Sequence, residues 1–224
     1  ASARRSFGIP TGFTLLYSGR ISHDKSVSFL ADVYKEILSV FPDVNLVFAG
    51  DGPALDDLKI DLDGCDRVVF TGYLDREELP ALYSLADLFV FPSTTDTFGM
   101  VVLEAQACGL PALVTDQGGP QEIIEDGRTG FVVEAGNRSK WITKLSDMIR
   151  LHATHSDTYR YMEVRARRRV RDHYTWSRAL ENLLDIRQPA ERSDGAFQSH
   201  AHYYKAPMHV HGTTPRRLSP KDFV

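Results

Sequence analysis

Short runs of β-branched and aromatic residues alternate with longer amphipathic stretches between residues 13 and 186. This alternation is typical of βαβ units, in which helices connect parallel strands. The runs predicted to be strands are residues 13–18, 44–49, 67–70, 88–91, 111–115 and 130–133. Because such crossovers are right-handed, we expect an α/β domain with an open, mostly parallel six-stranded sheet and helices on both faces.

The composition divides the chain into three parts. Residues 1–12 precede the first strand and are interpreted as the remnant of an inter-domain linker. Residues 13–186 form one domain, whose last helices are predicted over residues 138–151, 157–173 and 177–186. Residues 187–224 are rich in Pro, Ser, Gly, His and Arg without apolar periodicity, which indicates a tail or an appendage.

Charge and cysteine content limit the partners and the compartment. The chain has 26 basic and 30 acidic residues and a net charge of −4, so no positive field attracts a nucleic acid, and we expect no such partner. Cys65 and Cys108 are too few for a disulfide scaffold and are expected to be buried thiols in a reducing compartment. Without a signal peptide or a long apolar run, a cytoplasmic, non-spanning chain is expected.

Two cations follow the first predicted strand. Arg20 comes directly after Gly19, and Lys25 stands just before a predicted helix. In an open parallel sheet, ligands bind outside the carboxyl ends of the strands, where helix N-termini converge. A guanidinium and an ammonium in one such loop suit a diphosphate. The alternative is a solvated loop with surface charges.

Residues 94–101 lead into the helix predicted over residues 100–108, with Gly99 at its first turn. Unpaired N–H groups at that turn suit a phosphate or sugar oxygen, and a glycine permits close approach. An ordinary N-cap is another use of Asp96 or Thr97, and the two uses can coexist.

Glu104 lies on the helical face of Val101 and Cys108. A carboxylate beside apolar neighbours requires partners, and two ribose hydroxyls would satisfy both of its oxygens. The alternative is a partly exposed glutamate paired with a nearby cation. Tyr73 and Leu74, after the third strand, offer an aromatic surface and free backbone groups to a nucleobase edge, although aromatic residues at strand ends usually belong to the core.

The motifs of several other enzyme classes are missing. Gly50 and Gly52 follow the second strand instead of the first, and the third glycine of a dinucleotide fingerprint is absent, which disfavours a nicotinamide or flavin dehydrogenase. The sequence also lacks a P-loop lysine motif, a His-Glu-x-x-His pair and a Gly-x-Ser-x-Gly elbow.

Ordered pieces of sequence occupy residues 17–25, 47–53, 69–74, 82–93, 96–111 and 118–133. In order and spacing they resemble the C-terminal, donor-binding half of the family 4 (group 1) retaining glycosyltransferases. These are enzymes of the GT-B fold, with two Rossmann-like domains facing across a cleft. The resemblance covers residues 13–186 and implies that they form the Rossmann-like domain that binds a nucleotide sugar.

The resemblance also implies roles for individual residues. Arg20, Lys25 and Asp96 would be catalytic, the two cations by holding the donor diphosphate and stabilising the leaving group, and Glu104 would bind the ribose. The residues implied to contact the donor are Gly19, Gly50, Tyr73, Leu74, Thr97, Phe98, Gly99, Met100, Val101 and Glu104. The reaction would transfer a hexose from a UDP- or GDP-sugar to an acceptor hydroxyl with retention, and no metal or cofactor is implied.

Two departures from the family stand out. Asp96, eight positions before Glu104, replaces the usual glutamate. It keeps the charge but shortens the reach toward the donor sugar by about 1.5 Å, a change that some members share. The family's N-terminal acceptor domain is missing before residue 13, so we expect this chain alone to be inactive. A non-catalytic nucleotide-sugar-binding module and a GT-B sugar-nucleotide epimerase-like domain remain as alternatives.

Two clusters lie apart from these motifs. One predicted helix carries six arginines within residues 160–171, which suit peripheral contact with anionic lipid headgroups, although a solvated helix face is the alternative. They are Arg160, Arg165, Arg167, Arg168, Arg169 and Arg171. In the tail, His200, His202, His209 and His211 could chelate a divalent metal, although their spacing matches no standard site.

Overall fold

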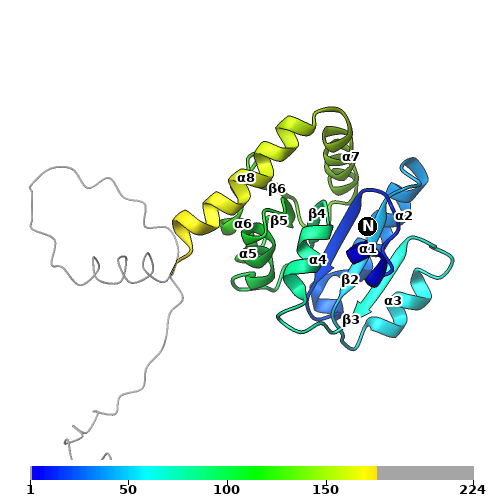
Figure 1. The fold of residues 1–224 in the computed structure, drawn as a ribbon. Coiled ribbons are helices and arrows are strands. Elements are labelled where there is room, and N and C mark those ends of the chain that lie inside the picture. The colour runs from blue at the N-terminus through cyan, green and yellow to red at the C-terminus, as the bar shows by residue number, and fades with distance from the viewer. Residues whose placement is uncertain (1, 176–224) are drawn as a thin grey trace, which may run out of the picture. The chain divides into compact units, whose positions relative to one another are not determined.

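The computed structural model describes residues 2–175 and builds them around a six-stranded sheet (Figure 1). The strands are β1 (Thr14–Ser18), β2 (Asn45–Ala49), β3 (Val68–Gly72), β4 (Leu88–Phe91), β5 (Ala112–Thr115) and β6 (Gly130–Val133). Their order is β3-β2-β1-β4-β5-β6, and every neighbouring pair is parallel. The predicted α/β class and six-stranded sheet are therefore confirmed.

The central strands are buried from end to end. Every residue of β1, β2, β4 and β5 is buried. Strands of a parallel sheet that is covered on both faces are continuous apolar runs, since neither face meets water. This explains why the strands appear in the sequence as short runs without polar alternation.

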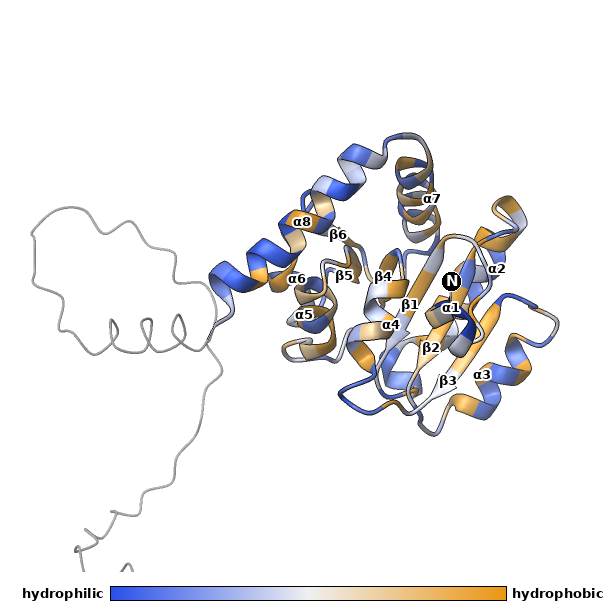
Figure 2. Ribbon diagram, viewed as in Figure 1, coloured by the Kyte–Doolittle hydropathy of each residue, from blue (hydrophilic) through white to orange (hydrophobic). Residues whose placement is uncertain are grey.

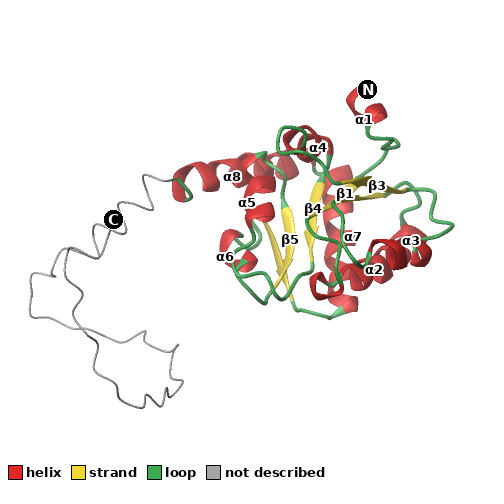
Figure 3. Ribbon diagram, turned by 90° about the horizontal axis from the view of Figure 1, so that it is seen from below, coloured by secondary structure: helices red, strands yellow, loops and turns green. Residues whose placement is uncertain are grey.

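Helices cover both faces of the sheet (Figure 3). After β1 they are η1 (His23–Lys25), α2 (Val27–Val40), α3 (Leu55–Asp61), α4 (Leu79–Leu85), α5 (Met100–Ala107), α6 (Pro120–Ile123), α7 (Arg138–Thr154) and α8 (Ser156–His173). Helices α2, α3 and α7 lie on one side of the sheet and α4 and α5 on the other, while α8 packs against α5 and α7. In Figure 2 the strands are mainly hydrophobic, whereas much of α8 is hydrophilic.

The long helices near the end of the described chain match their predictions closely. The helix expected over residues 157–173 is α8, which begins one residue earlier, and the helix expected over residues 138–151 is α7, which runs on to Thr154. The helix expected over residues 177–186 and the tail at 187–224, with its histidines, lie outside the described residues.

Within residues 1–12, the expected linker remnant, the chain forms a short helix, α1 (Ser2–Ser6). Arg4 fastens this helix to the domain, because its Nη2 donates to the Leu85 carbonyl oxygen at 2.8 Å. The same nitrogen lies 3.5 Å from Oδ2 of Asp87. The segment before β1 is thus tied to the edge at which β1 and β4 begin.

Asp87, just before β4, is the centre of a polar cluster at that edge. Its Oδ2 accepts the Thr14 N–H at 2.7 Å, and its carbonyl oxygen accepts the Tyr159 hydroxyl at 2.5 Å. Nε2 of His152 lies 3.7 Å from its Oδ1. Burial raises the pKa of the Asp87 carboxyl, although the Thr14 N–H, His152 and Arg4 act in the opposite direction. The cluster joins β1, β4, α7 and α8.

We expect Asp87→Ala to lower the free energy of unfolding by about 1–2 kcal/mol, because the Thr14 N–H loses its acceptor. Asp87→Asn keeps an amide oxygen in that place and should cost less. The raised pKa means that the carboxyl stabilises the fold most when it is protonated, and that this contribution is lost as the pH rises through the raised pKa. The Asn variant should lack this part of the pH dependence.

Urea unfolding of the wild-type, Ala and Asn chains over a pH series that starts near pH 4 measures both effects. An Ala variant as stable as the Asn variant would show that Asp87 is not needed as an acceptor. A wild-type chain that gains stability over the Asn variant as the pH rises would contradict the direction of the pKa shift.

Candidate functional site

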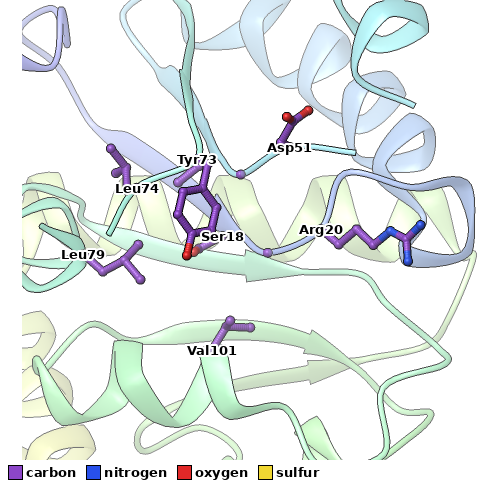
Figure 4. Close-up of a pocket in the computed structure, with 10 residues that line it drawn as sticks. Ser18, Arg20, Asp51, Tyr73, Leu74, Leu79 and Val101 are labelled. Atoms are coloured by element: carbon purple, nitrogen blue, oxygen red, sulfur yellow. The ribbon is translucent and has the colours of Figure 1, made fainter. Parts of the chain in front are cut away.

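A cavity of about 360 Å³ opens at the carboxyl ends of β1, β2 and β3 (Figure 4). Its lining consists of Ser18, Gly19, Arg20, Ala49, Gly50, Asp51, Tyr73, Leu74, Leu79 and Val101. Six residues that were predicted for the site belong to this lining, namely Gly19, Arg20, Gly50, Tyr73, Leu74 and Val101. The cavity lies beside the point between β1 and β4 where the strand order reverses, which is where such sheets bind ligands.

The floor of the cavity is bare backbone. The Gly19 N–H donates to the Ala49 carbonyl oxygen at 2.9 Å, and the Gly50 N–H donates to the Gly72 carbonyl oxygen at 2.8 Å. A Cβ at Gly50 would lie only 2.0 Å from the Gly19 carbonyl oxygen, at a φ of +142°. Glycine is therefore required at position 50 for the two loops to approach each other and leave the floor open.

The walls of the cavity are largely apolar. Tyr73 is 77% exposed, and in Figure 4 its ring lies among Leu74, Leu79 and Val101. The Arg20 guanidinium points away from this ring. A flat aromatic surface beside aliphatic side chains suits a planar ring, and the outward guanidinium suits a charged group at the cavity's other end.

A second group of predicted residues meets at an ion pair across the strand reversal. Nζ of Lys25 lies 3.0 Å from Oδ2 of Asp96, and the two side chains are only 19% and 25% exposed. The ammonium also donates to Oγ1 of Thr95 at 3.4 Å, and that hydroxyl donates to the Asp24 carbonyl oxygen at 3.2 Å. Ser26, directly after Lys25, has a φ of +58°, which is unusual for a residue with a side chain.

Asp96 has a second partner, because its Oδ1 accepts the Gly99 N–H at 3.0 Å. The carboxylate thus holds the backbone that begins α5 at the same time as it holds Lys25. The expected use of Asp96 or Thr97 as the N-cap is wrong, because the N-cap residue of α5 is Gly99 and no side chain caps the helix; Asp96 instead accepts the N–H of that N-cap residue. One oxygen fixes the helix start and the other fixes the cation.

The loop before α5 rests on the first residues of α6. The Gly119 N–H donates to the Asp96 carbonyl oxygen at 2.9 Å. A Cβ at Gly119 would lie 2.1 Å from the Thr97 carbonyl oxygen and 2.7 Å from Cα of Phe98. Backbone therefore touches backbone here, and α6 sets the position of the loop.

The start of α5 faces the crevice with free backbone groups. Gly99 has a φ of +89° and precedes the helix, so the N–H groups of Met100 and Val101 come before any acceptor inside it. The side chains of Thr97, Phe98 and Met100 are exposed, with exposed fractions of 45% for Phe98 and 55% for Met100. These three residues can thus offer a ligand their backbone and their outward side chains.

Glu104 is half-buried on α5, one turn after Val101 of the cavity lining. Its Oε2 accepts the hydroxyl of Tyr83 on α4 at 3.2 Å. The partner found is therefore a phenol and not the cation that was considered from the sequence. Sequence reasoning missed Tyr83, because no local pattern links positions on two different helices.

The arginines of α8 do not form one outward row. Arg167 donates to the Cys108 carbonyl oxygen at 2.7 Å and Arg169 to the Ile123 carbonyl oxygen at 2.6 Å, so both serve the ends of neighbouring helices. Arg168 and Arg171 share Asp172. Contact of the remaining face with anionic lipid stays a prediction.

Over residues 2–175, no helix is both long enough and apolar enough to cross a membrane. In the same part of the chain, no three His, Cys, Asp or Glu side chains gather as candidate metal ligands. Cys65 and Cys108 are free thiols of intermediate exposure, so the expectation that they are buried is met only in part.

Comparison with known sequences points to one family. The chain matches the family model described as "Glycosyl transferases group 1" over residues 2–169. It is 35% identical over 183 residues to the sulfoquinovosyl transferase SQD2 of Arabidopsis thaliana, a match that covers 80% of this chain and 34% of that protein. The chain spans roughly a third to a half of the length of the curated relatives it matches.

Solved structures share the same architecture. Anabaena HepE in complex with UDP and glucose superposes with a TM-score of 0.71 at 22% identity, covering 83% of this chain and 50% of that one. The C-terminal domain of LpcC, a group 1 glycosyl transferase from Francisella tularensis, superposes with a TM-score of 0.67 at 24% identity. That match covers 78% of this chain and 92% of the solved domain. At these identities the two structures establish the fold.

Proposed function

The chain belongs to the group 1 glycosyltransferases, and from that membership we propose that its described domain binds the nucleotide-sugar donor of a hexosyl transfer. The observation that carries the proposal is the pairing of two features at one edge of the sheet. An apolar cavity with an exposed aromatic ring lies beside a partly buried cation and the open N-terminus of α5. A nucleoside diphosphate matches these two features, because it has a flat base at one end and an anionic diphosphate at the other.

We assign the parts of the donor accordingly. The base occupies the cavity beside Tyr73 and Leu74, and the ribose hydroxyls bind Glu104. The diphosphate lies between Arg20, Lys25 and the first N–H groups of α5, where cations and a helix N-terminus both favour negative charge. The hexose then reaches the backbone of residues 97–100. Asp96 holds Lys25 and Gly99, and its remaining lone pairs are left as acceptors for hydroxyl groups of the sugar.

The chemistry that follows is transfer of a hexose with retention. The bond from the anomeric carbon to the β-phosphate oxygen breaks, a bond to the acceptor oxygen forms, and the acceptor's proton leaves with the diphosphate. Arg20 and Lys25 stabilise the charge that develops on the departing diphosphate, as preorganised electrostatic catalysis requires. The residues assigned here need no metal for that role.

We propose that the acceptor binds to a second domain and that this chain alone binds the donor without transferring its sugar. The support is that the matched curated relatives are two to three times as long as the matched part. If a protein that contains both domains bound a UDP-sugar but transferred nothing to any acceptor, the alternative of a non-catalytic binding module would be favoured.

Isothermal titration of this chain with UDP and GDP, and with the monophosphates UMP and GMP, tests the proposal. We begin with UDP because the solved HepE complexes contain UDP or UDP-glucose. We expect UDP or GDP to bind at millimolar concentration or below, and the corresponding monophosphate to bind about tenfold more weakly, since it lacks the phosphate that would reach Lys25. Absence of binding by both diphosphates at millimolar concentration would overturn the site assignment.

A further inference from the structure

A buried phenol lies behind the carboxylate that we assign to the ribose. Tyr83 on α4 is only 2% exposed, and its hydroxyl donates to Oε2 of Glu104 on α5 at 3.2 Å. Its ring packs edge-on against Phe89 of β4, with 5.9 Å between the ring centroids. The ring therefore cannot swing aside without disturbing the core, and its hydroxyl is held against Glu104.

The other buried tyrosines behave differently. The hydroxyls of Tyr17, Tyr34 and Tyr159 donate to the carbonyl oxygens of Arg20, Val44 and Asp87, which are structural partners along the backbone. Among the buried tyrosines of residues 2–175, Tyr83 alone donates its hydroxyl proton to a carboxylate. A buried phenol can be satisfied by any nearby carbonyl group, so a carboxylate partner on the edge of a binding cavity calls for another explanation.

The protonation of the pair fixes the direction of the hydrogen bond. Burial raises the pKa of the Tyr83 hydroxyl far above its usual range, so the group stays protonated and remains a donor. Its one proton lies on Oε2 of Glu104, which leaves Oε1 and the second lone pair of Oε2 as acceptors for a ligand. A ribose offers two neighbouring hydroxyl donors, which match these two acceptors.

We propose that Tyr83 is a positioning residue that holds the Glu104 carboxylate in the orientation that selects a ribose over a deoxyribose. Tyr83 does not touch the donor and acts through Glu104. The inference rests on the proposed function, because it presupposes that Glu104 meets the ribose of a nucleotide.

The test compares UDP with 2′-deoxy-UDP as titrants of the wild-type chain and of Tyr83→Phe. We expect the wild type to prefer UDP, and Tyr83→Phe to lose about three- to tenfold in UDP affinity with little change for the deoxynucleotide, since Tyr83 does not touch the nucleotide and a misoriented Glu104 costs about as much as one neutral hydrogen bond. The matched control is Tyr34→Phe, which removes the same atom from a buried tyrosine whose partner is the Val44 carbonyl oxygen. It should leave the preference for UDP unchanged.

A second variant distinguishes the loss of Glu104 positioning from a folding defect in Tyr83→Phe. Glu104→Gln should reduce the preference for UDP by itself, and adding Tyr83→Phe to it should reduce the preference no further, because the two residues act as one unit. An unchanged preference in Tyr83→Phe, or an equal loss of affinity for both nucleotides, would overturn the positioning role and leave the proposed function standing. A wild-type chain that binds no UDP and no GDP would overturn the proposed function and this inference with it.

Discussion

Replacing Lys25 with alanine is expected to weaken the binding of UDP or GDP by about 10- to 100-fold. A hydrogen bond to a charged group is worth about 1.5–3 kcal/mol, and each 1.4 kcal/mol corresponds to about a factor of ten. The Lys25 side chain is only 19% exposed, so solvent screens the contact incompletely. The loss also leaves the Asp96 carboxylate without its cation, and the uncovered negative charge repels the diphosphate.

Titration calorimetry on two further variants separates these contributions. Lys35→Ala removes another lysine that pairs with an aspartate, Asp61, at 2.5 Å, and it should leave nucleotide affinity unchanged. Lys25→Ala combined with Asp96→Asn removes the repulsion and should recover part of the lost affinity. If Lys25→Ala bound UDP and GDP as well as the wild type does, Lys25 would have no place in the diphosphate site.

Alanine at Gly119 is expected to lower the free energy of unfolding by about 3 kcal/mol, as overpacking against rigid neighbours does, and to weaken nucleotide binding as well. The backbone of Gly119 lies in the ordinary right-handed region, so the cost comes from the clash alone. The new Cβ would meet backbone atoms of Thr97 and Phe98 at 2.1 to 2.7 Å. This clash can be relieved only if the loop before α5 moves, and the start of α5 would then move with the loop.

Gly136→Ala is the matched control. Gly136 has a φ of +68°, which alanine disfavours by about 1–2 kcal/mol, but no atom lies within 4 Å of its would-be Cβ. Thermal unfolding and UDP titration of both variants should show that Gly119→Ala is the less stable of the two and that it alone loses affinity. A Gly119→Ala chain with normal stability and normal UDP affinity would mean that α6 does not determine the position of the loop before α5.

The sheet could be predicted from the sequence because burial on both faces leaves an unambiguous pattern. Each central strand is a short, mainly apolar run, and a glycine or proline lies close to at least one of its ends. Helix α1 could not be predicted in this way, since five residues are too few to show a helical period. It is held by the contact of Arg4 with the Leu85 carbonyl oxygen, which is 81 positions away.

In the candidate site, too, some residues could be placed together from the sequence and others could not. Gly19, Arg20, Gly50 and Tyr73 could be placed together, because the carboxyl ends of parallel strands meet at one edge. The two pairings that orient the site could not. Lys25 and Asp96 are 71 positions apart, and Tyr83 reaches Glu104 only through the packing of α4 on α5. Such pairings depend on side-chain geometry that no local pattern encodes.

The sheet is least continuous directly beneath this site. β1 pairs with β2 from Thr14 to Ser18, but it pairs with β4 only at Leu15 and Leu16. Lys25 follows β1 and belongs to the half of the sheet formed by β3, β2 and β1. The start of α5 follows β4 and belongs to the half formed by β4, β5 and β6. A diphosphate bound by both would therefore link the two halves of the sheet, and its binding free energy would add to the free energy that holds them together. Slippage between β1 and β4 would in turn lower nucleotide affinity before either half unfolds.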